Sequence, residues 1–256
     1  MIGFIRCSEV AGFFPRQPIL CKRRICGMTF LEAEIFLPKN RTRKRAAARA
    51  IQRGAKKLRN ARVNRYVKPS GPFLWEELLM SYGLFSVTQS RLFTAMAVPL
   101  TLRILEEEGQ PPHSSIVALC GERTGPLLEQ IALSLCQKVR NLAINAVGSE
   151  NLCRRLRQEY GVPVLEGGAG MTQSAVTLLF SPLLPGREAG TGSGPVLYFG
   201  SAPPGIASNR RLVQSAAFTL REGEPLPEDW DRSALLSVLY EQGRIGLSEI
   251  EIEQLS

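Results

Sequence analysis

Hydrophobic and polar residues along this chain follow two periods, one typical of strands and one typical of helices. Residues 30–38, FLEAEIFLP, alternate well enough to predict a strand that ends at Pro38. Residues 42–59 place small and apolar side chains on one helical stripe, which predicts an amphipathic helix with a narrow buried face. That stripe consists of Ala47, Ala50, Ile51, Gly54, Ala55 and Leu58.

Further along, short apolar runs alternate with helical periods. Residues 115–121, SIVALCG, are typical of a strand covered on both faces, and residues 124–139 predict a helix with Pro126 in its first turn. Other strands are predicted at 63–69, 141–147, 162–167, 174–181 and 194–200, and other helices at 73–83, 90–109, 149–161 and 231–243. This alternation predicts an α/β fold with a mostly parallel sheet and helices on both faces.

Two stretches show the same order of strand, loop, helix and strand. Asn40-Arg41-Thr42 matches Glu122-Arg123-Thr124 in the loop, and a second short match lies at the end of each helix. We infer two βαβ-type halves, residues 28–110 and residues 111–256, although any two βαβ units resemble each other. The Gly- and Pro-rich loop 182–195 in the second half is expected to be mobile.

Residues 1–27 show neither period and mix Pro, Gly, Cys and Arg. We therefore expect this segment to be a disordered or docking leader, or a start assigned upstream of Met28. It lacks the unbroken apolar core of a secretory signal.

Composition excludes several kinds of site. No apolar run reaches the roughly 18 residues that cross a bilayer, so we expect a cytoplasmic protein without membrane insertion. The six cysteines form no C-x-x-C pair and His113 is the only histidine, so no zinc site of usual spacing is predicted. His113 follows two prolines without a nucleophile nearby, and we interpret it as a surface-loop residue. The oligomeric state is left open.

Positive charge is concentrated in one segment. Thirteen Lys and Arg residues lie in the segment from Lys39 to Lys68. The rest of the chain has 19 Lys and Arg residues and 23 Asp and Glu residues. No acid occurs between Glu34 and Glu76, which is unusual for an ordinary solvated helix. Contact with the phosphates of a nucleic acid is one hypothesis for this segment. Its residues would be Lys39, Arg41, Arg43, Lys44, Arg45, Arg49, Arg53, Lys56 and Lys57.

A second candidate site follows the apolar strand 115–121. The turn GERTG leads into a helix, whose free amide groups and dipole favour an anion. If the two halves face each other, Arg41 and Arg123 would converge on one phosphate or carboxylate. Residues 115–168 resemble the front half of a Rossmann-type dinucleotide-binding domain, although the G-x-G-x-x-G spacing is missing. The resemblance implies NAD(P) as the cofactor and Glu150 as a ribose ligand.

These patterns lead to one preferred function and two alternatives. We expect a Rossmann-like protein that binds a phosphorylated small ligand, a nucleotide or dinucleotide, with weak catalysis or none. The ligand would be held by Gly121, Arg123, Thr124, Gly125, Ser149 and Glu150. The alternatives are a nucleic-acid-associated protein that uses the basic helix, and a structural protein whose basic helix meets an acidic partner. The sequence contains no known catalytic motif that would indicate a particular reaction.

Overall fold

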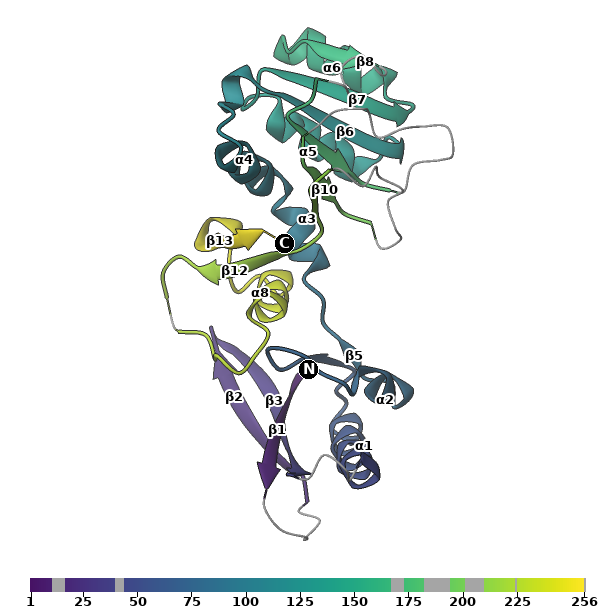
Figure 1. The fold of residues 1–256 in the computed structure, drawn as a ribbon, viewed down its shortest axis with the longest axis vertical. Coiled ribbons are helices and arrows are strands. Elements are labelled where there is room, and N and C mark those ends of the chain that lie inside the picture. Colours follow the sequence, from purple (N-terminus) through teal and green to yellow (C-terminus); the bar gives the residue numbers. More distant parts are fainter. Residues whose placement is uncertain are drawn as a thin grey trace. The chain divides into compact units, whose positions relative to one another are not determined.

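The computed structural model describes residues 1–10, 17–39, 44–166, 173–181, 194–200, 210–223 and 225–255. The chain forms two compact units (Figure 1). Unit 1 comprises Met1–Leu92 and Ala217–Glu253, and unit 2 comprises Phe93–Ala216 and Gln254–Ser256. The sequence-based boundary near residue 110 differs from this division, because residues 93–110 already belong to unit 2 and residues 217–253 belong to unit 1.

Unit 1 is built on a five-stranded sheet of order β2-β3-β1-β4-β5. The strands are β1 (Ile2–Val10), β2 (Ile19–Ile25), β3 (Met28–Pro38), β4 (Arg65–Val67) and β5 (Phe85–Ser86). All neighbours are parallel except β2 and β3, which pair antiparallel around the turn at Cys26 and Gly27. Gly27 has a φ of 72°, a backbone conformation that favours glycine.

Residues 1–27 differ from the expected leader, because they supply two strands of this sheet. β1 is its central strand, and Phe4 and Ile5 on its two faces are fully buried. Its pattern misleads because one face changes from apolar at Ile2 and Phe4 to polar at Arg6 and Ser8. The β1 segment therefore shows neither a regular alternation of polar and apolar residues nor a continuous apolar run, which are the two patterns that predict a strand.

The basic helix α1 (Lys44–Asn60) packs its small side chains against β3. A Cβ atom at Gly54 would collide with the Ile35 side chain, so glycine permits this close approach. Ile51, Ala55 and Leu58 are fully buried in the same cluster. The narrow apolar stripe predicted for this helix is therefore the face that covers the sheet.

Two further helices complete the unit 1 core. α2 (Glu76–Ser81) packs against α1 (Figure 1), and α8 (Arg232–Glu241) begins at Asp231, whose side chain accepts a hydrogen bond from the Ala234 amide. Trp230, directly before α8, is fully buried and stacks on Phe4 with ring centroids 3.9 Å apart.

A separate two-stranded sheet contains β12 (Ala216–Leu220) and β13 (Ile250–Leu255). The 3-10 turn Leu247–Glu249 directly precedes β13.

Unit 2 is built on a six-stranded sheet of order β11-β10-β9-β6-β7-β8, and every neighbouring pair is parallel. The strands are β6 (Ile116–Arg123), β7 (Asn141–Val147), β8 (Val164–Glu166), β9 (Val176–Leu179), β10 (Val196–Tyr198) and β11 (Leu212–Val213). Numbered within the unit, this order is 3-2-1-4-5-6, which is the order of the Rossmann fold. The prediction of a Rossmann-like α/β protein with a mostly parallel sheet is confirmed.

Helices of unit 2 connect and cover these strands (Figure 1). They are α3 (Ser90–Ala95), which begins in unit 1, α4 (Ala97–Glu107), α5 (Pro126–Leu135) and α6 (Glu150–Tyr160), and a 3-10 turn covers Pro112–Ser114. α4 packs against α5 and β9, and α6 packs against β8. Most of the loop 182–195 lies outside the described residues, so its expected mobility stays a prediction.

Candidate functional site

The candidate site lies at the carboxyl end of β6, in the middle of the unit 2 sheet. β6 pairs with β7 on one side and with β9 on the other. The chain leaves β6 through α5 toward β7, whereas β9 and β10 extend the sheet in the opposite direction. This reversal is the topological switch point, where ligands bind in open α/β sheets. Sequence reasoning placed the candidate turn at this strand, but only the strand order shows that the strand is central.

The turn after β6 is shorter than the sequence predicted. β6 does not end at Gly121 but continues with an irregular register to Arg123, which pairs with Val147 of β7. The Thr124 amide donates a 2.9 Å hydrogen bond to the Val147 carbonyl oxygen. Strand pairing therefore occupies residues that a glycine-rich dinucleotide turn would leave free, and the turn proper is limited to Thr124 and Gly125.

The amino end of α5 keeps its anion-binding character. Gly125 is the N-cap, and no side-chain hydrogen bond caps the helix among the described residues. Pro126 occupies the first turn and has no amide hydrogen, so the Leu127 and Leu128 amides are the first-turn donors. A Cβ atom added at Gly125 would have no neighbour within 4 Å in the described part of the chain. Among the described residues, none fills the space directly beside Gly125.

The second pair of predicted residues follows the neighbouring strand. Ser149 is the N-cap residue of α6 and is buried, and Glu150 is exposed in the first turn. The Thr124–Val147 hydrogen bond ties the β6–α5 turn to the end of β7, just before these residues. All six predicted residues thus lie at the carboxyl ends of two adjacent strands. That they bind a ligand stays a proposal.

The charges around the turn are mixed. Glu122 and Arg123 are both exposed. The positive charge of Arg123 favours a bound anion, whereas the negative charge of Glu122 opposes one. The Glu122 amide is already engaged, because it donates a 2.7 Å hydrogen bond to Ser181 Oγ, two residues after β9. Thr124 Oγ1 is buried and has no hydrogen-bond partner among the described residues. The hydroxyl therefore retains its capacity to donate.

A buried arginine two residues before β11 was missed by the sequence analysis. Arg210 is 8% exposed and donates hydrogen bonds to Thr177 Oγ1 at 2.9 Å and to the Gly194 carbonyl at 2.8 Å. Burial lowers its pKa. Burial also raises the pKa of the Cys120 thiol to about 12, and the positive charge of Arg210 opposes that rise. The pair Arg210-Arg211 directly before a short strand was the available signal.

The residues of the nucleic-acid hypothesis lie in unit 1. Lys39, Lys44, Arg45, Arg49 and Lys56 are exposed, whereas Arg53 and Lys57 are half-buried. Lys57 Nζ donates a 2.8 Å hydrogen bond to the Pro18 carbonyl oxygen. Arg41 and Arg43 lie outside the described residues, so the convergence of Arg41 with Arg123 on one anion stays a prediction.

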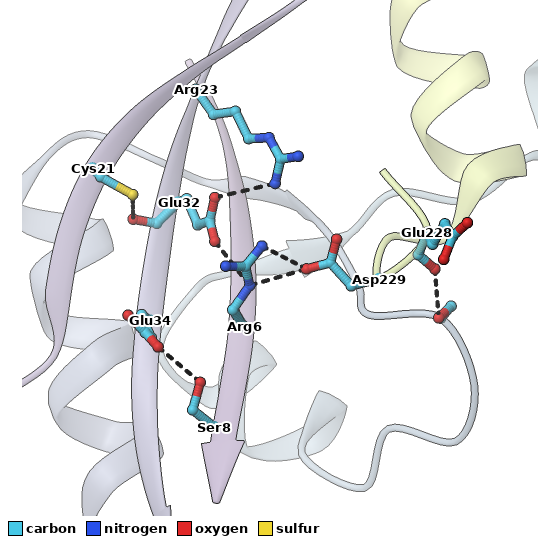
Figure 2. Close-up of polar contacts among 9 residues, drawn as sticks. Arg6, Ser8, Cys21, Arg23, Glu32, Glu34, Glu228 and Asp229 are labelled. Atoms are coloured by element: carbon cyan, nitrogen blue, oxygen red, sulfur yellow. Dashed lines mark hydrogen bonds and ion pairs between the residues drawn. The ribbon is translucent and has the colours of Figure 1, made fainter. Parts of the chain in front are cut away.

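The opposite face of the unit 1 sheet carries a polar network that sequence reasoning also missed (Figure 2). Glu32 on β3 has a side chain only 6% exposed, with a carboxylate oxygen 3.1 Å from Arg6 Nε and another 3.8 Å from Arg23 Nη1. Arg6 also donates to Asp229 Oδ2 at 2.7 Å and 2.9 Å. The Arg23 guanidinium lies 5.6 Å from the Trp230 ring centroid. Because these charges satisfy one another, we interpret the network as structural.

The described part of the chain shows neither a metal-binding cluster nor a helix that could span a membrane. It contains no group of three or more His, Cys, Asp and Glu side chains that could hold a metal ion. Among the helices with described residues, none has the length and apolar character needed to span a membrane.

Comparison with known proteins found no matching family model and no matching curated relative. Among solved structures, the chain is similar to the apo form of D-mandelate dehydrogenase from Rhodotorula graminis, with 12% identity over 71% of this chain and a TM-score of 0.33. L-tryptophan dehydrogenase from Nostoc punctiforme shows 12% identity over 80% of this chain and a TM-score of 0.35. A putative aspartate carbamoyltransferase from Trypanosoma cruzi shows 11% identity over 81% of this chain and a TM-score of 0.33.

The chain spans 56%, 64% and 72% of the lengths of these three proteins, respectively. At such low scores the Rossmann-like character of unit 2 rests on its own strand order.

Proposed function

We propose that unit 2 binds a phosphorylated small ligand, a nucleotide or dinucleotide, at the carboxyl end of β6. The observation that carries the proposal is the uncapped amino end of α5 at the topological switch point of a six-stranded parallel sheet. A phosphate there would accept hydrogen bonds from the Leu127 and Leu128 amides and interact favourably with the helix dipole.

Neighbouring side chains extend this site in the proposal. Arg123, exposed at the same turn, would neutralise phosphate charge, and the Thr124 hydroxyl would donate one hydrogen bond. Ser149 and Glu150, after the next strand, would contact a hydroxyl-bearing part of the ligand such as a ribose. NAD(P) is the first dinucleotide to test. The proposal assigns binding and leaves any reaction unassigned.

The sharpest test places a charge at Gly125. Its φ of −137° suits any residue and its surroundings are open, so Gly125→Asp should fold and cap α5. Its carboxylate would occupy the amides and repel a phosphate, so the thermal shift produced by millimolar NAD, NADP or ATP should disappear. Gly125→Asn is the control of equal size without the charge, and it should retain a larger part of the shift.

Two results would contradict the proposal. One is the lack of any thermal shift of the unaltered protein with every one of these ligands at millimolar concentration. The other is an equal shift in the unaltered protein and Gly125→Asp, since ligand binding would then lie elsewhere.

A further inference from the structure

Helix α1 gathers several basic residues in one element, and none of them is in an ion pair with a described acidic side chain. Arg6, Arg23, Arg65, Lys68, Arg91, Arg103, Arg155 and Arg211 each lie within 4.0 Å of an acidic side chain. Within the described ranges, no ion pair involves a Lys or Arg of α1. Among the described residues, ion pairs compensate basic charge at these eight positions, and none compensates it along α1.

The basic residues of α1 also occupy a definite face. Ile51, Gly54, Ala55 and Leu58 form the buried stripe against β3. At 3.6 residues per turn, Arg45, Arg49 and Lys56 lie on the opposite side of the helix, whereas Arg59 lies on its flank. Arg45, Arg49 and Lys56 are exposed. Together these three residues form one outward ridge, named here the α1 ridge, that runs over about 16 Å of the helix axis.

Several contacts fix the α1 ridge in place. Gly54 allows close packing of α1 on Ile35, and Lys57 Nζ is held by the Pro18 carbonyl oxygen. The Arg59 guanidinium lies next to Gly83, where an added Cβ would be 3.4 Å from Arg59 Cζ. A rigid row of charges loses less entropy when it binds than a flexible basic tail.

The chemistry of the ridge favours one class of partner. A single row of exposed guanidinium and ammonium groups matches a row of phosphates, which carry one charge per about 3.4 Å along each strand of a duplex. Single-stranded nucleic acid is held by aromatic stacking in addition to charge, and α1 contains no aromatic residue. We propose that the α1 ridge binds the phosphate backbone of a nucleic-acid duplex without reading its sequence. This surface is separate from the site proposed in unit 2.

The test compares two triple variants of the full chain. Arg45→Gln, Arg49→Gln and Lys56→Gln together remove three charges from the α1 ridge. The control, Lys138→Gln, Arg140→Gln and Arg154→Gln, removes three exposed charges from unit 2. Binding to labelled DNA and RNA duplexes of about 20 base pairs is followed by fluorescence anisotropy between about 0.05 and 0.2 M salt. Thermal melts verify that both variants remain folded.

The expected result is a strong salt dependence that the ridge controls. The unaltered protein and the unit 2 variant should bind with a slope of log K against log salt of about −3 or steeper. The ridge variant should bind at least about tenfold more weakly at low salt, and its slope should decrease in magnitude by about 2 to 3. The DNA and RNA arms show which duplex supplies the phosphates.

Four outcomes would overturn the proposal. These are a lack of duplex binding, equal losses in the two variants, tighter binding to single strands than to duplexes, and equal or tighter binding to polyglutamate or phosphatidylserine vesicles. The last outcome would identify an acidic protein or a membrane surface as the partner. None of these outcomes bears on the NAD(P) and ATP shifts at Gly125.

Discussion

One buried residue in each of the two larger sheets shows how burial controls charge. In unit 1 the Glu32 carboxylate is nearly inaccessible, and Arg6 and Arg23 compensate its charge. Removal of one partner from such a group leaves a buried charge without compensation. In unit 2 the Cys120 thiol on β6 is fully buried, and its raised pKa keeps it neutral in the folded chain.

Cys120 is expected to make stability depend on alkaline pH. A raised folded-state pKa means that its contribution is complete below the ordinary thiol pKa of 9.0 and is lost as the pH rises toward about 12. Between pH 8 and pH 10, the free energy of unfolding measured in urea should fall by about 1 kcal/mol more for the unaltered protein than for Cys120→Ala. The same pH dependence in both proteins would show that the thiol is not shielded.

At the scale of elements, the decisive strand is β1. It pairs with β3 along nine residues and with β4 along three, so it joins the basic βαβ segment into one sheet. β3 and β4, which the sequence analysis treated as consecutive strands of one βαβ half, are neighbours of β1 and not of each other. In unit 2 the corresponding strands β6 and β7 are direct neighbours. The two halves therefore share an order of elements but differ in how the strands pair.

Phe4 on β1 tests the role of residues 1–27 in the fold. It is fully buried and stacks on Trp230, so Phe4→Ala should lower the free energy of unfolding by about 3–5 kcal/mol in chemical denaturation. Ile19→Ala lies in the same segment but at a side chain that is 52% exposed, and its effect should stay below about 0.5 kcal/mol. Similar small effects of both substitutions would support a leader without a structural role.

At the scale of the whole molecule, the chain builds two larger sheets in separate units, and it returns from the second unit to the first. Residues 217–253 belong to unit 1, to which they contribute Trp230, Asp229 and helix α8. The proposed ligand site and the α1 ridge lie in different units, so each can be altered without direct change to the other.

Hydrogen exchange should reveal both cores in the intact protein. Peptides that cover the central strands β1 and β6 should take up deuterium more slowly than peptides from the edge strands β2 and β11. If NAD(P) binds as proposed, added ligand should slow exchange at residues 121–128 without an effect on α1. Rapid exchange of β1 would contradict its central place in the sheet.

The sequence by itself determined the alternation of strands and helices, the buried stripe of α1 and the concentration of basic charge. These features depend on local periodicity, which is set by residues that are close together in the sequence. The apolar run 115–121 and the turn that follows it were predicted for the same reason, and they led to the candidate site in unit 2.

Only the tertiary structure decided which strands are neighbours. The place of β1 between β3 and β4, and the pairing of Arg6 with Asp229 across 223 positions of sequence, depend on which buried surfaces fit together. The 3-2-1-4-5-6 order of unit 2 depends on the same packing. Local pattern carries no information about these distant contacts, because many chain topologies satisfy the same alternation of polar and apolar residues.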